Sequence, residues 1–388
     1  MEVNFINNNN TNLNEKFLKQ NDWNLGDFTI LIDEKDSNFS WNKTAFEYDW
    51  CYGNGTLKNP YIIENVTFGT DSPNKSIIIK NSLVYFIVRN CIFNYCFEGI
   101  GFFNVSNGLI LNNLFLNTYS TSIFFKTCFN VTISANQLTQ VGYEGIACEQ
   151  CNNITIIHNT IDTFYGMNYG VYCYNLTYSK IMNNTIKFTG GYNKIGLFFS
   201  HHNYLYNNSL LSSGGDGIHT YESDYNIISK NLIKDCSWGM FLERNSCYNL
   251  IINNIIKQRD VGIKIAPNCN FNLVTNNTLE FNDINRPSSI YDGIDISSSN
   301  YNNITFNSIA YYYYGISLCC SNYSYVYNNT LYKNFKTCIY ENDCIGNVIF
   351  NNNCIPIDKI TGFNYMIILI ILLSSIIFIK KRKFIVVP

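Results

Sequence analysis

The sequence predicts an all-β fold in which the chain winds into a parallel β-helix of about 12 to 13 coils, and three observations predict it. An Asn followed by a short apolar segment recurs about every 23 residues. A Gly followed by an aliphatic residue recurs with nearly the same period. The apolar runs between these markers are short and show no lasting 3.6-residue period, which favours strands joined by corners over helices.

The composition limits the class of protein. The chain has 388 residues, a formal net charge of −2 and only 14% charged residues. This balance gives no electrostatic argument for a nucleic-acid partner. With 46% hydrophobic residues the chain can bury a core, and its many aromatic side chains suit strands.

The recurring Asn is expected to be part of the scaffold and not of a site. Asn tolerates the left-handed backbone of a sharp corner, and stacked Asn amides can hydrogen-bond from one coil to the next. The series begins with Asn65 and Asn90 and ends with Asn352. Its central members form the predicted ladder: Asn113, Asn136, Asn159, Asn184, Asn208, Asn231, Asn254, Asn277, Asn307 and Asn329.

The spacing of the two markers shows where the coil varies in length. The step from Gly to the next Asn is nearly constant, whereas the step from Asn to the next Gly varies. Insertions therefore fall in one corner, beside the strand that begins with Gly, and such insertions often surround a binding face. The longest runs from Asn282 to Tyr291, contains Pro287 and is expected to project as a loop.

The chain divides into three predicted parts. Residues 1–58 form an N-terminal lead-in or cap, 59–357 the β-helix, and 358–388 one transmembrane helix with a basic cytoplasmic tail. The 20 residues 360–379 are almost all apolar after Asn364, long enough to span a bilayer, and Lys and Arg residues follow at once. The positive charge places the β-helix outside a single-pass cell membrane. A sorting tail that is later removed would show the same pattern.

The N-terminus does not match that location. Residues 1–20 contain no continuous hydrophobic stretch and therefore no visible secretion signal. Either the start lies upstream, or export is unconventional, or a tail-anchored protein faces the cytoplasm; an incomplete start is favoured. Asn42, Asn54 and Asn74 lie in glycosylation sequons before the ladder and are the better candidates for a glycoprotein.

The cysteines predict neither a metal site nor a cofactor. There are 15, so at least one is unpaired within the chain. Cys148 and Cys173 share the same phase and are expected to stack inward on adjacent coils. Cys151 completes a lone Cys-x-x-Cys with Cys148, but an inward Cys148 cannot chelate a metal with it. Buried free thiols are favoured, and disulfide pairing stays open.

The residues resemble a known family. The segment from Gly53 to Phe68, GNGTLKNPYIIENVTF, with Trp50 and Cys51 before it, is similar to the lead-in of archaeal surface proteins of the right-handed parallel β-helix type. The same repeat type is seen in nitrous-oxide-reductase accessory (NosD-like) proteins and in carbohydrate-binding and sugar-hydrolase domains. The resemblance extends from about Trp41 to Lys383 and implies the fold. Copper delivery does not carry over, because the four histidines are not joined by a Met or Cys cluster.

The resemblance also implies that the outer face of the Gly-Ile strands binds sugars. Strand alternation places aromatic and acidic side chains together on that face. Aromatic rings can stack on sugar rings while carboxylates bind hydroxyls. The predicted groove for a glycan or surface polymer is lined by Tyr172, Tyr174, Phe198, Tyr221, Phe241 and Glu243. The oligomeric state is not predicted.

An enzyme is the alternative, and three functional classes stay open. A polysaccharide lyase, hydrolase or epimerase would use the catalytic candidates Asp216, His219, Lys264, Asp292 and Asp295. Asp292 and Asp295, three residues apart, are expected to point in different directions. Asp216 and Asp292 are expected three coils apart, roughly 14 Å, too far for a hydrolase pair. A glycan-binding or structural module without catalysis is therefore favoured, and a plain surface spacer is the third class.

Overall fold

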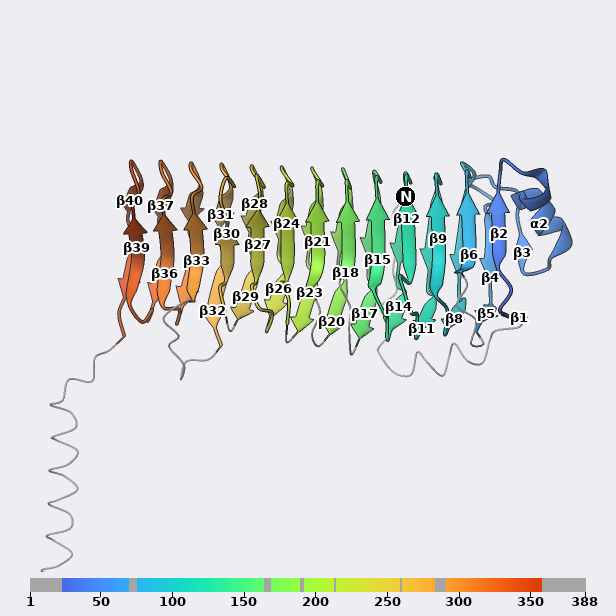
Figure 1. The fold of residues 1–388 in the computed structure, drawn as a ribbon, viewed down its shortest axis with the longest axis horizontal. Coiled ribbons are helices and arrows are strands. Elements are labelled where there is room, and N and C mark those ends of the chain that lie inside the picture. The colour runs from blue at the N-terminus through green and yellow to red at the C-terminus, as the bar shows by residue number, and fades with distance from the viewer. Residues whose placement is uncertain are drawn as a thin grey trace, which may run out of the picture.

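The computed structural model describes residues 23–69, 75–163, 169–188, 192–212, 214–258, 260–282 and 291–357. Within them the chain winds through about twelve turns that stack into a straight rod (Figure 1). Each full turn contributes one strand to each of three parallel sheets. The predicted parallel β-helix is therefore confirmed.

The three sheets are here named A, B and C. Strands pair in parallel with those of the neighbouring turns, except that β3, at the edge of sheet C, pairs antiparallel with β4. Sheet A contains β1 (Trp23–Gly26), β5 (Val66–Phe68), β8 (Ile92–Asn94), β11 (Leu114–Leu116), β14 (Gln137–Thr139), β17 (Thr160–Thr163), β20 (Thr185–Phe188), β23 (Ser209–Ser212), β26 (Leu232–Lys234), β29 (Ile255–Gln258), β32 (Thr278–Phe281), β35 (Ser308–Ala310), β38 (Thr330–Tyr332) and β41 (Asn353–Ile355).

Sheet B contains β2 (Ile30–Asp33), β6 (Lys75–Lys80), β9 (Glu98–Phe103), β12 (Ile123–Lys126), β15 (Glu144–Glu149), β18 (Tyr169–Tyr174), β21 (Asn193–Phe198), β24 (Ile218–Tyr221), β27 (Met240–Glu243), β30 (Ile263–Ile265), β33 (Asp292–Ser297), β36 (Tyr314–Cys319) and β39 (Thr337–Asn342). Sheet C contains β3 (Cys51–Tyr52), β4 (Tyr61–Glu64), β7 (Phe86–Arg89), β10 (Gly108–Leu111), β13 (Thr132–Ser134), β16 (Thr155–Ile157), β19 (Lys180–Met182), β22 (Tyr204–Tyr206), β25 (Ile227–Ser229), β28 (Leu250–Ile252), β31 (Leu273–Thr275), β34 (Asn303–Thr305), β37 (Tyr325–Tyr327) and β40 (Val348–Phe350).

The predicted Asn ladder forms one continuous row at the corner between sheets C and A. The backbone N–H and the side-chain amide of Asn136 both donate to Oδ1 of Asn159, at 3.0 and 2.9 Å. The same two bonds recur four turns further, from Asn231 to Oδ1 of Asn254. These side chains are about 1% exposed or less. The ladder therefore satisfies polar groups that a corner would otherwise bury unpaired.

The reason expected for the ladder was wrong in one respect. The left-handed residue of each corner is the one before the ladder Asn, as at Ala135 (φ 55°) and Lys230 (φ 55°). Asn65 and Asn90 have positive φ themselves, so they lie one residue out of phase, and Cys91 holds the ladder position of its turn. The buried position selects Asn for its hydrogen bonds, and the exposed position before it accepts many residue types.

A second buried ladder, not predicted from the sequence, follows the corner between sheets B and C. It comprises Asn203, Asn226, Asn249, Asn272 and Asn302, each accepting the N–H of the preceding member. Outside it runs an exposed row of rings, here named the corner stack, with neighbouring centroids 4.9–5.3 Å apart and nearly parallel planes. It comprises Tyr178, His202, Tyr225, Tyr248, Phe271, Tyr301 and Tyr323.

The Gly column marks the entry into sheet B, where the chain turns tightly. A Cβ on Gly239 would lie 2.4 Å from the carbonyl oxygen of Gly262 and 2.5 Å from Ile256. Gly196 also precedes an aliphatic residue and was therefore expected in this column, but it is out of phase. It aligns with His219, and Lys194 fills the Gly position of its turn. The inserted residues fall between strands of sheets A and B, as predicted, and residues 283–290 of the longest insertion lie outside the described ranges.

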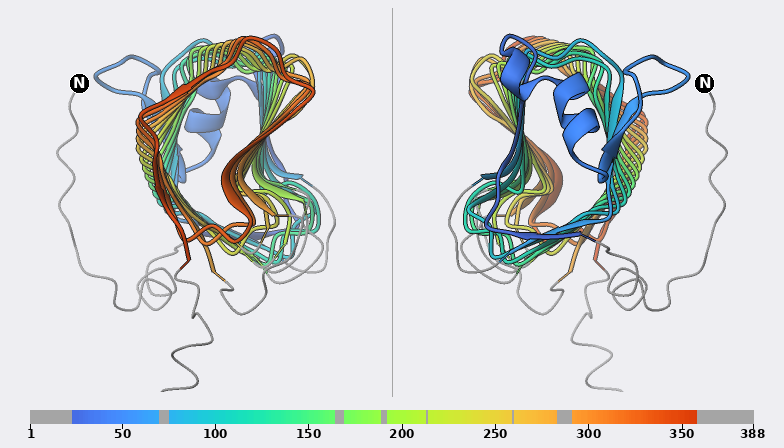
Figure 2. Two further views of the ribbon diagram at one scale, coloured as in Figure 1. Left: turned by 90° about the vertical axis from the view of Figure 1, so that its left-hand side faces the viewer. Right: turned by 90° about the vertical axis from the view of Figure 1, so that its right-hand side faces the viewer.

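The N-terminal end of the rod carries a cap. The short helices η1 (Ser37–Phe39) and α2 (Trp41–Glu47) lie over the mouth of the coil (Figure 2). Ser40 caps α2 by accepting the N–H of Lys43. Trp41 is 1% exposed and stacks on Tyr61 at 5.2 Å. Strands β1 and β2 precede residue 59, so the sheets extend into the segment expected as lead-in.

The predicted membrane segment, residues 360–379, lies outside the described residues. Among the residues that are described, no helix is both long enough and apolar enough to cross a bilayer.

Candidate functional site

The candidate site is the outer face of sheet B, whose strands run along the middle of Figure 1. Three columns of side chains point outward there. Column 1 stands just before the Gly position and includes Tyr169, Asn193, Asp216, Trp238, Asp292 and Tyr314. Column 2 includes Tyr172, Gly196, His219, Phe241, Lys264, Asp295 and Ser317. Column 3 includes Glu149, Tyr174, Phe198, Tyr221 and Glu243.

The structure thus places all the predicted ligand-binding residues on one face, with one correction. Counting two residues on from each Gly of the Gly-Ile strands predicts Phe198 and His219 in the same column, but Phe198 lies one column over, aligned with Tyr174 and Tyr221. The cause is the phase of Gly196, which is an outward residue in this turn. Column 1 was not predicted as a column. The chain bends at the Gly position, so the alternation of inward and outward side chains along the strand does not extend across it.

His219 is the centre of one hydrogen-bonded cluster. The N–H of Asp216 donates to Oδ1 of Asn193 at 3.0 Å, so the amide nitrogen of Asn193 faces Nδ1 of His219, 2.9 Å away. Nδ1 therefore accepts, the ring proton sits on Nε2, and Nε2 donates to Glu243 at 3.1 Å. Burial lowers the pKa of His219, against the raising effect of Glu243. The ring is held in one tautomer and one orientation.

Aromatic rings enclose this histidine. Phe241 stacks on it with centroids 4.9 Å apart, and Phe198 meets it edge-on at 5.5 Å. Trp238 packs edge-on against Phe241 at 4.5 Å. Tyr172 extends the row by packing against Phe198 at 5.4 Å. The face therefore offers a strip of rings with one neutral imidazole inside it.

Lys264 is the centre of a second cluster, two turns along the same column. Its ammonium donates to Oδ2 of Asp295 and, at 3.0 Å, to the hydroxyl of Ser297. Ser297 donates in turn to Oδ1 of Asp295 at 3.0 Å. The side chains of Lys264 and Asp295 are 22% and 17% exposed. The hydrogen bonds within this partly buried triad give both charged side chains a partner and hold all three side chains in fixed positions.

Asp292 joins the second cluster, contrary to the expectation that it points away from Asp295. Gly293 and Ile294 both face the interior, since a Cβ on Gly293 would meet Ile309 and Ile294 is fully buried. Two consecutive inward residues break the alternation and leave Asp292 and Asp295 on the outer face. Burial, and next the charge of Asp295, raise the pKa of Asp292 to about 7.

Asp216 and Asp292 are not brought together. Strands β24, β27, β30 and β33 are successive neighbours, so three rung spacings, roughly 14 Å, separate the two residues. Burial raises the pKa of Asp216 to about 6, against the attraction of Lys194. The face thus carries two carboxyl groups with a raised pKa, the partly buried Asp216 in the first cluster and the buried Asp292 in the second.

Asp292→Asn is expected to stabilise the protein at high pH only. The pKa of Asp292 is raised on folding, so the native state binds its proton more tightly than the unfolded chain. Stability is therefore lost as pH rises from about 4 to about 7, by about 2–4 kcal/mol. The Asn variant avoids this loss, so its free energy of unfolding should match the native protein at pH 4 and exceed it at pH 8. Chemical unfolding at both pH values measures the difference.

Exposed Asp49 offers the matched control, because Asp49→Asn removes a carboxylate with little burial and should shift stability equally at both pH values. A stability gain of Asp292→Asn that is the same at pH 4 and pH 8 would contradict the raised pKa.

Comparison with known proteins identifies the repeat. The model of a family described as "Periplasmic copper-binding protein (NosD)" matches residues 118–268, and that of the "Right handed beta helix region" matches 29–186. No curated protein sequence matches the chain.

Solved structures of similar shape include the A-module of the mannuronan C-5 epimerase AlgE6 of Azotobacter vinelandii, with 9% identity, a TM-score of 0.43, and coverage of 76% of this chain and 87% of that one. A double mutant of the periplasmic alginate epimerase AlgG has 11% identity, a TM-score of 0.46 and coverage of 84% and 83%. The tailspike of E. coli bacteriophage HK620, in complex with a pentasaccharide, has 11% identity, a TM-score of 0.49 and coverage of 72% and 65%. These values carry no inference about activity.

The residues present do not fit a copper site of the kind that the first family description implies. His158 lies at the C–A corner, His201 and His202 lie at the B–C corner, and His219 lies on sheet B. In the described ranges no three His, Cys, Asp or Glu side chains are placed to share a metal ion. Cys148 and Cys173 stack inward as predicted and are fully buried. The described residues therefore supply no ligand set suited to copper.

The strand order, the repeat length and the two matching family models agree with one another. The chain is a right-handed parallel β-helix repeat protein, and its residues 118–268 are similar to the NosD family model.

Proposed function

We propose that the outer face of sheet B binds a glycan and that the protein acts as a binding module. The observation that carries this is the strip in which aromatic rings alternate with fixed hydrogen-bonding groups at the rung spacing. Phe198 and Phe241 flank His219, and the Lys264–Asp295 pair follows directly. Sugar rings present apolar C–H faces and hydroxyl edges, which such a strip complements.

The corner stack is a poorer candidate for sugar binding, although it is more exposed. Tyr225 lies between His202 and Tyr248 with both ring faces covered, at 5.1 and 4.9 Å. Only ring edges and hydroxyls reach the solvent there. On sheet B, in contrast, the rings do not form one parallel stack. Phe241 stacks on His219 but meets Trp238 edge to face, and Phe198 lies at an angle to both Tyr172 and His219. This arrangement supports assigning the ligand to sheet B.

Phe241→Ala and Tyr172→Ala are each expected to weaken oligosaccharide binding about tenfold, because each removes a stacking surface worth roughly 1–1.5 kcal/mol. A glycan array selects the ligand, and titration calorimetry with the purified full chain measures its affinity.

Tyr225→Ala is the matched control, since Tyr225 is 50% exposed but belongs to the corner stack. Its affinity for the selected oligosaccharide should equal that of the native chain. An affinity that falls with Tyr225→Ala but not with Phe241→Ala would place the binding site at the corner stack instead of on sheet B. An array without any bound glycan would favour the structural spacer.

A specific observation also supports a second candidate, a polysaccharide lyase, hydrolase or epimerase. Asp292 has a pKa of about 7 and lies beside the Lys264–Asp295 pair, so it can exchange a proton near neutral pH. If this function is correct, the chain should depolymerise or epimerise uronate polymers, and Asp295→Ala should abolish the turnover. If the native chain binds glycan without turnover, the enzyme is excluded and the binding module is favoured.

We also propose that residues 360–379 anchor the β-helix at the outer surface of a cell, from the apolar run and the Lys and Arg residues that follow it. Protease treatment of intact cells should digest the sheet-B region, whereas the tail after residue 379 should stay protected. A β-helix protected until the cells are lysed would count against this orientation. Asn42 and Asn54 are exposed and remain candidates for glycosylation there.

A further inference from the structure

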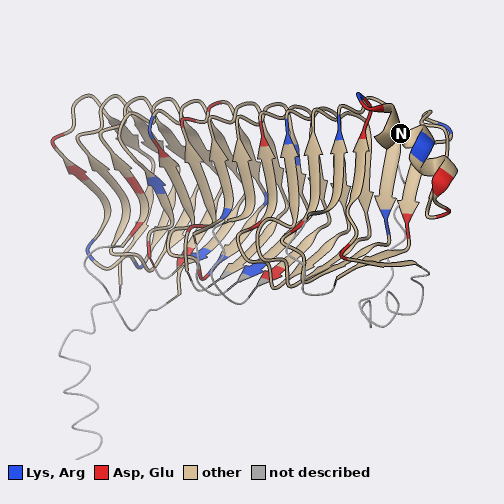
Figure 3. Cartoon of the chain, turned by 45° about the vertical axis from the view of Figure 1, so that its right-hand side comes forward, with Lys and Arg blue, Asp and Glu red and all other residues tan. Residues whose placement is uncertain are grey.

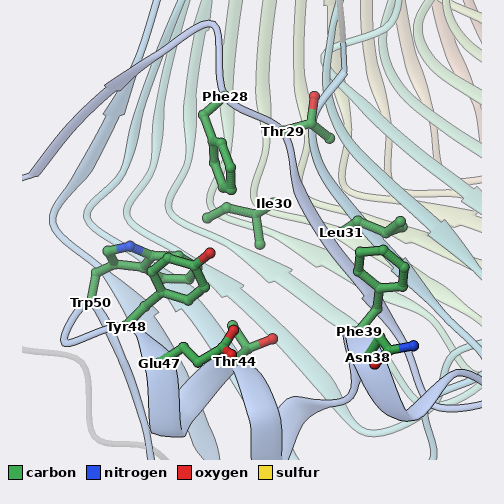
Figure 4. Close-up of a pocket in the computed structure, with 10 residues that line it drawn as sticks. All are labelled: Phe28, Thr29, Ile30, Leu31, Asn38, Phe39, Thr44, Glu47, Tyr48 and Trp50. Carbon is green, nitrogen blue, oxygen red and sulfur yellow. The ribbon is translucent and has the colours of Figure 1, made fainter.

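A separate pocket lies at the capped end of the rod, far along the chain from the glycan face. Its volume is about 280 Å³. It opens where β2, the terminal strand of sheet B, faces η1 and α2 (Figure 4). Ten residues line it: Phe28, Thr29, Ile30, Leu31, Asn38, Phe39, Thr44, Glu47, Tyr48 and Trp50.

The walls of this pocket are mainly aromatic. Trp50 is 3% exposed, and Tyr48 stacks on it at 4.8 Å. Phe28 continues this wall, 6.3 Å from Tyr48, and Phe39 stands on the opposite side (Figure 4). Phe28 and Phe39 remain 45% and 43% exposed. A folded protein rarely leaves several large rings around one concave site without a ligand to cover them.

One carboxylate is placed among these rings. Glu47 is the only acidic or basic residue among the ten that line the pocket. Its Oε1 pairs with Lys43 at 2.8 Å, but both side chains are about 40% exposed, so the pair is weak and easily exchanged. The hydroxyl of Thr44 is already used, since it donates to the carbonyl of Ser40. Glu47 is thus the group that selects the charge of the ligand.

The residues around the cap pocket carry an excess of negative charge, the same sign as that of a carboxylate at Glu47. The segment from Trp23 to Tyr52 contains six Asp and Glu residues and only two Lys residues. Figure 3 shows how sparse charged residues are along the coil, so this local excess is not a general feature of the rod. An anionic ligand would be repelled, and a neutral ligand would desolvate Glu47 without compensation.

We propose that the cap pocket binds a small organic cation, an ammonium group carried on an apolar body. The faces of Phe28, Phe39 and Tyr48 attract the cation, and Glu47 neutralises it. This site is independent of the glycan face, since it shares no residue with columns 1 to 3.

Choline and its uncharged isostere 3,3-dimethylbutan-1-ol are the probes, titrated into the full chain at constant ionic strength and followed by tryptophan fluorescence. Choline should saturate the site, and the isostere should bind about tenfold more weakly, since only the charge differs. Glu47→Gln and Phe39→Ala should each weaken choline about five- to tenfold.

Phe46→Ala is the matched control: Phe46 is 89% exposed, precedes Glu47 in α2 and does not line the pocket. It should leave choline affinity unchanged, as should Phe241→Ala on sheet B. Circular dichroism shows that each variant is folded. Equal affinity for the two probes, choline binding that survives both Phe39→Ala and Glu47→Gln, or no saturable binding would each overturn the proposal.

Discussion

Asn231→Ala is expected to lower the free energy of unfolding by about 3–5 kcal/mol, the largest effect of any single polar substitution proposed for this chain. The Asn231 amide donates to the carbonyl of Leu205 and to Oδ1 of Asn254. Its Oδ1 accepts both the backbone and the side-chain N–H of Asn208, each at 2.9 Å. Alanine removes all four bonds and leaves buried donors and acceptors without partners. Denaturant unfolding followed by circular dichroism measures the loss.

The control for Asn231→Ala is the residue directly before it. Lys230 is exposed and has a positive φ, so Lys230→Gly relieves a left-handed conformation and should change the free energy of unfolding by well under 1 kcal/mol. In a repeat protein the loss can be confined to neighbouring turns, and hydrogen exchange around β25 and β26 would then rise first. An Asn231→Ala protein as stable as Lys230→Gly would mean that the ladder has no stabilising role.

Trp41→Ala is expected to cost about 3–5 kcal/mol and to make the capped end prone to association. The indole is buried against Tyr61 and Phe86, at 5.2 and 5.1 Å, and its N–H donates to Ser82 at 2.9 Å. Its backbone N–H is held by Glu34 at 2.8 Å, which ties α2 to the chain after β2. Without the ring, the cap loses the contact that holds it over the mouth of the coil (Figure 2).

Thermal unfolding and light scattering measure the two consequences of Trp41→Ala. Phe46→Ala, in the same helix but 89% exposed, should leave both the unfolding midpoint and the scattering unchanged. If Trp41→Ala lowered the midpoint without any rise in scattering, the ring would stabilise the cap but not protect the sheet edges.

The candidate site was only partly accessible from the sequence, and particular residues show why. Tyr172, His219, Phe241, Lys264 and Asp295 could be assigned to one column, because a constant step along the chain becomes a column when turns stack in register. Phe198 was predicted in the wrong column, because Gly196 occupies an outward position but has the same sequence pattern as the Gly that marks the entry into sheet B. Asn193, which fixes the tautomer of His219, gave no signal in the sequence at all.

The cap pocket could not be predicted either. Its walls come from β2, η1 and α2, which have no repeat, so nothing in the sequence indicates which of their side chains meet. The aromatic residues Phe28, Phe39 and Tyr48 are ordinary members of a Tyr- and Phe-rich chain until the fold brings them around Glu47.

The sequence by itself determined the parallel β-helix, the Asn ladder, the corner that carries the insertions and the face on which aromatic and acidic residues gather. It could do so because each of these features repeats, and stacking converts a period into a straight row. Only the tertiary structure decided that Asp292 joins Asp295, that Asn193 orients His219 and that the cap encloses a pocket. Those contacts depend on single bends and on pairings between turns, which leave no periodic trace in the chain.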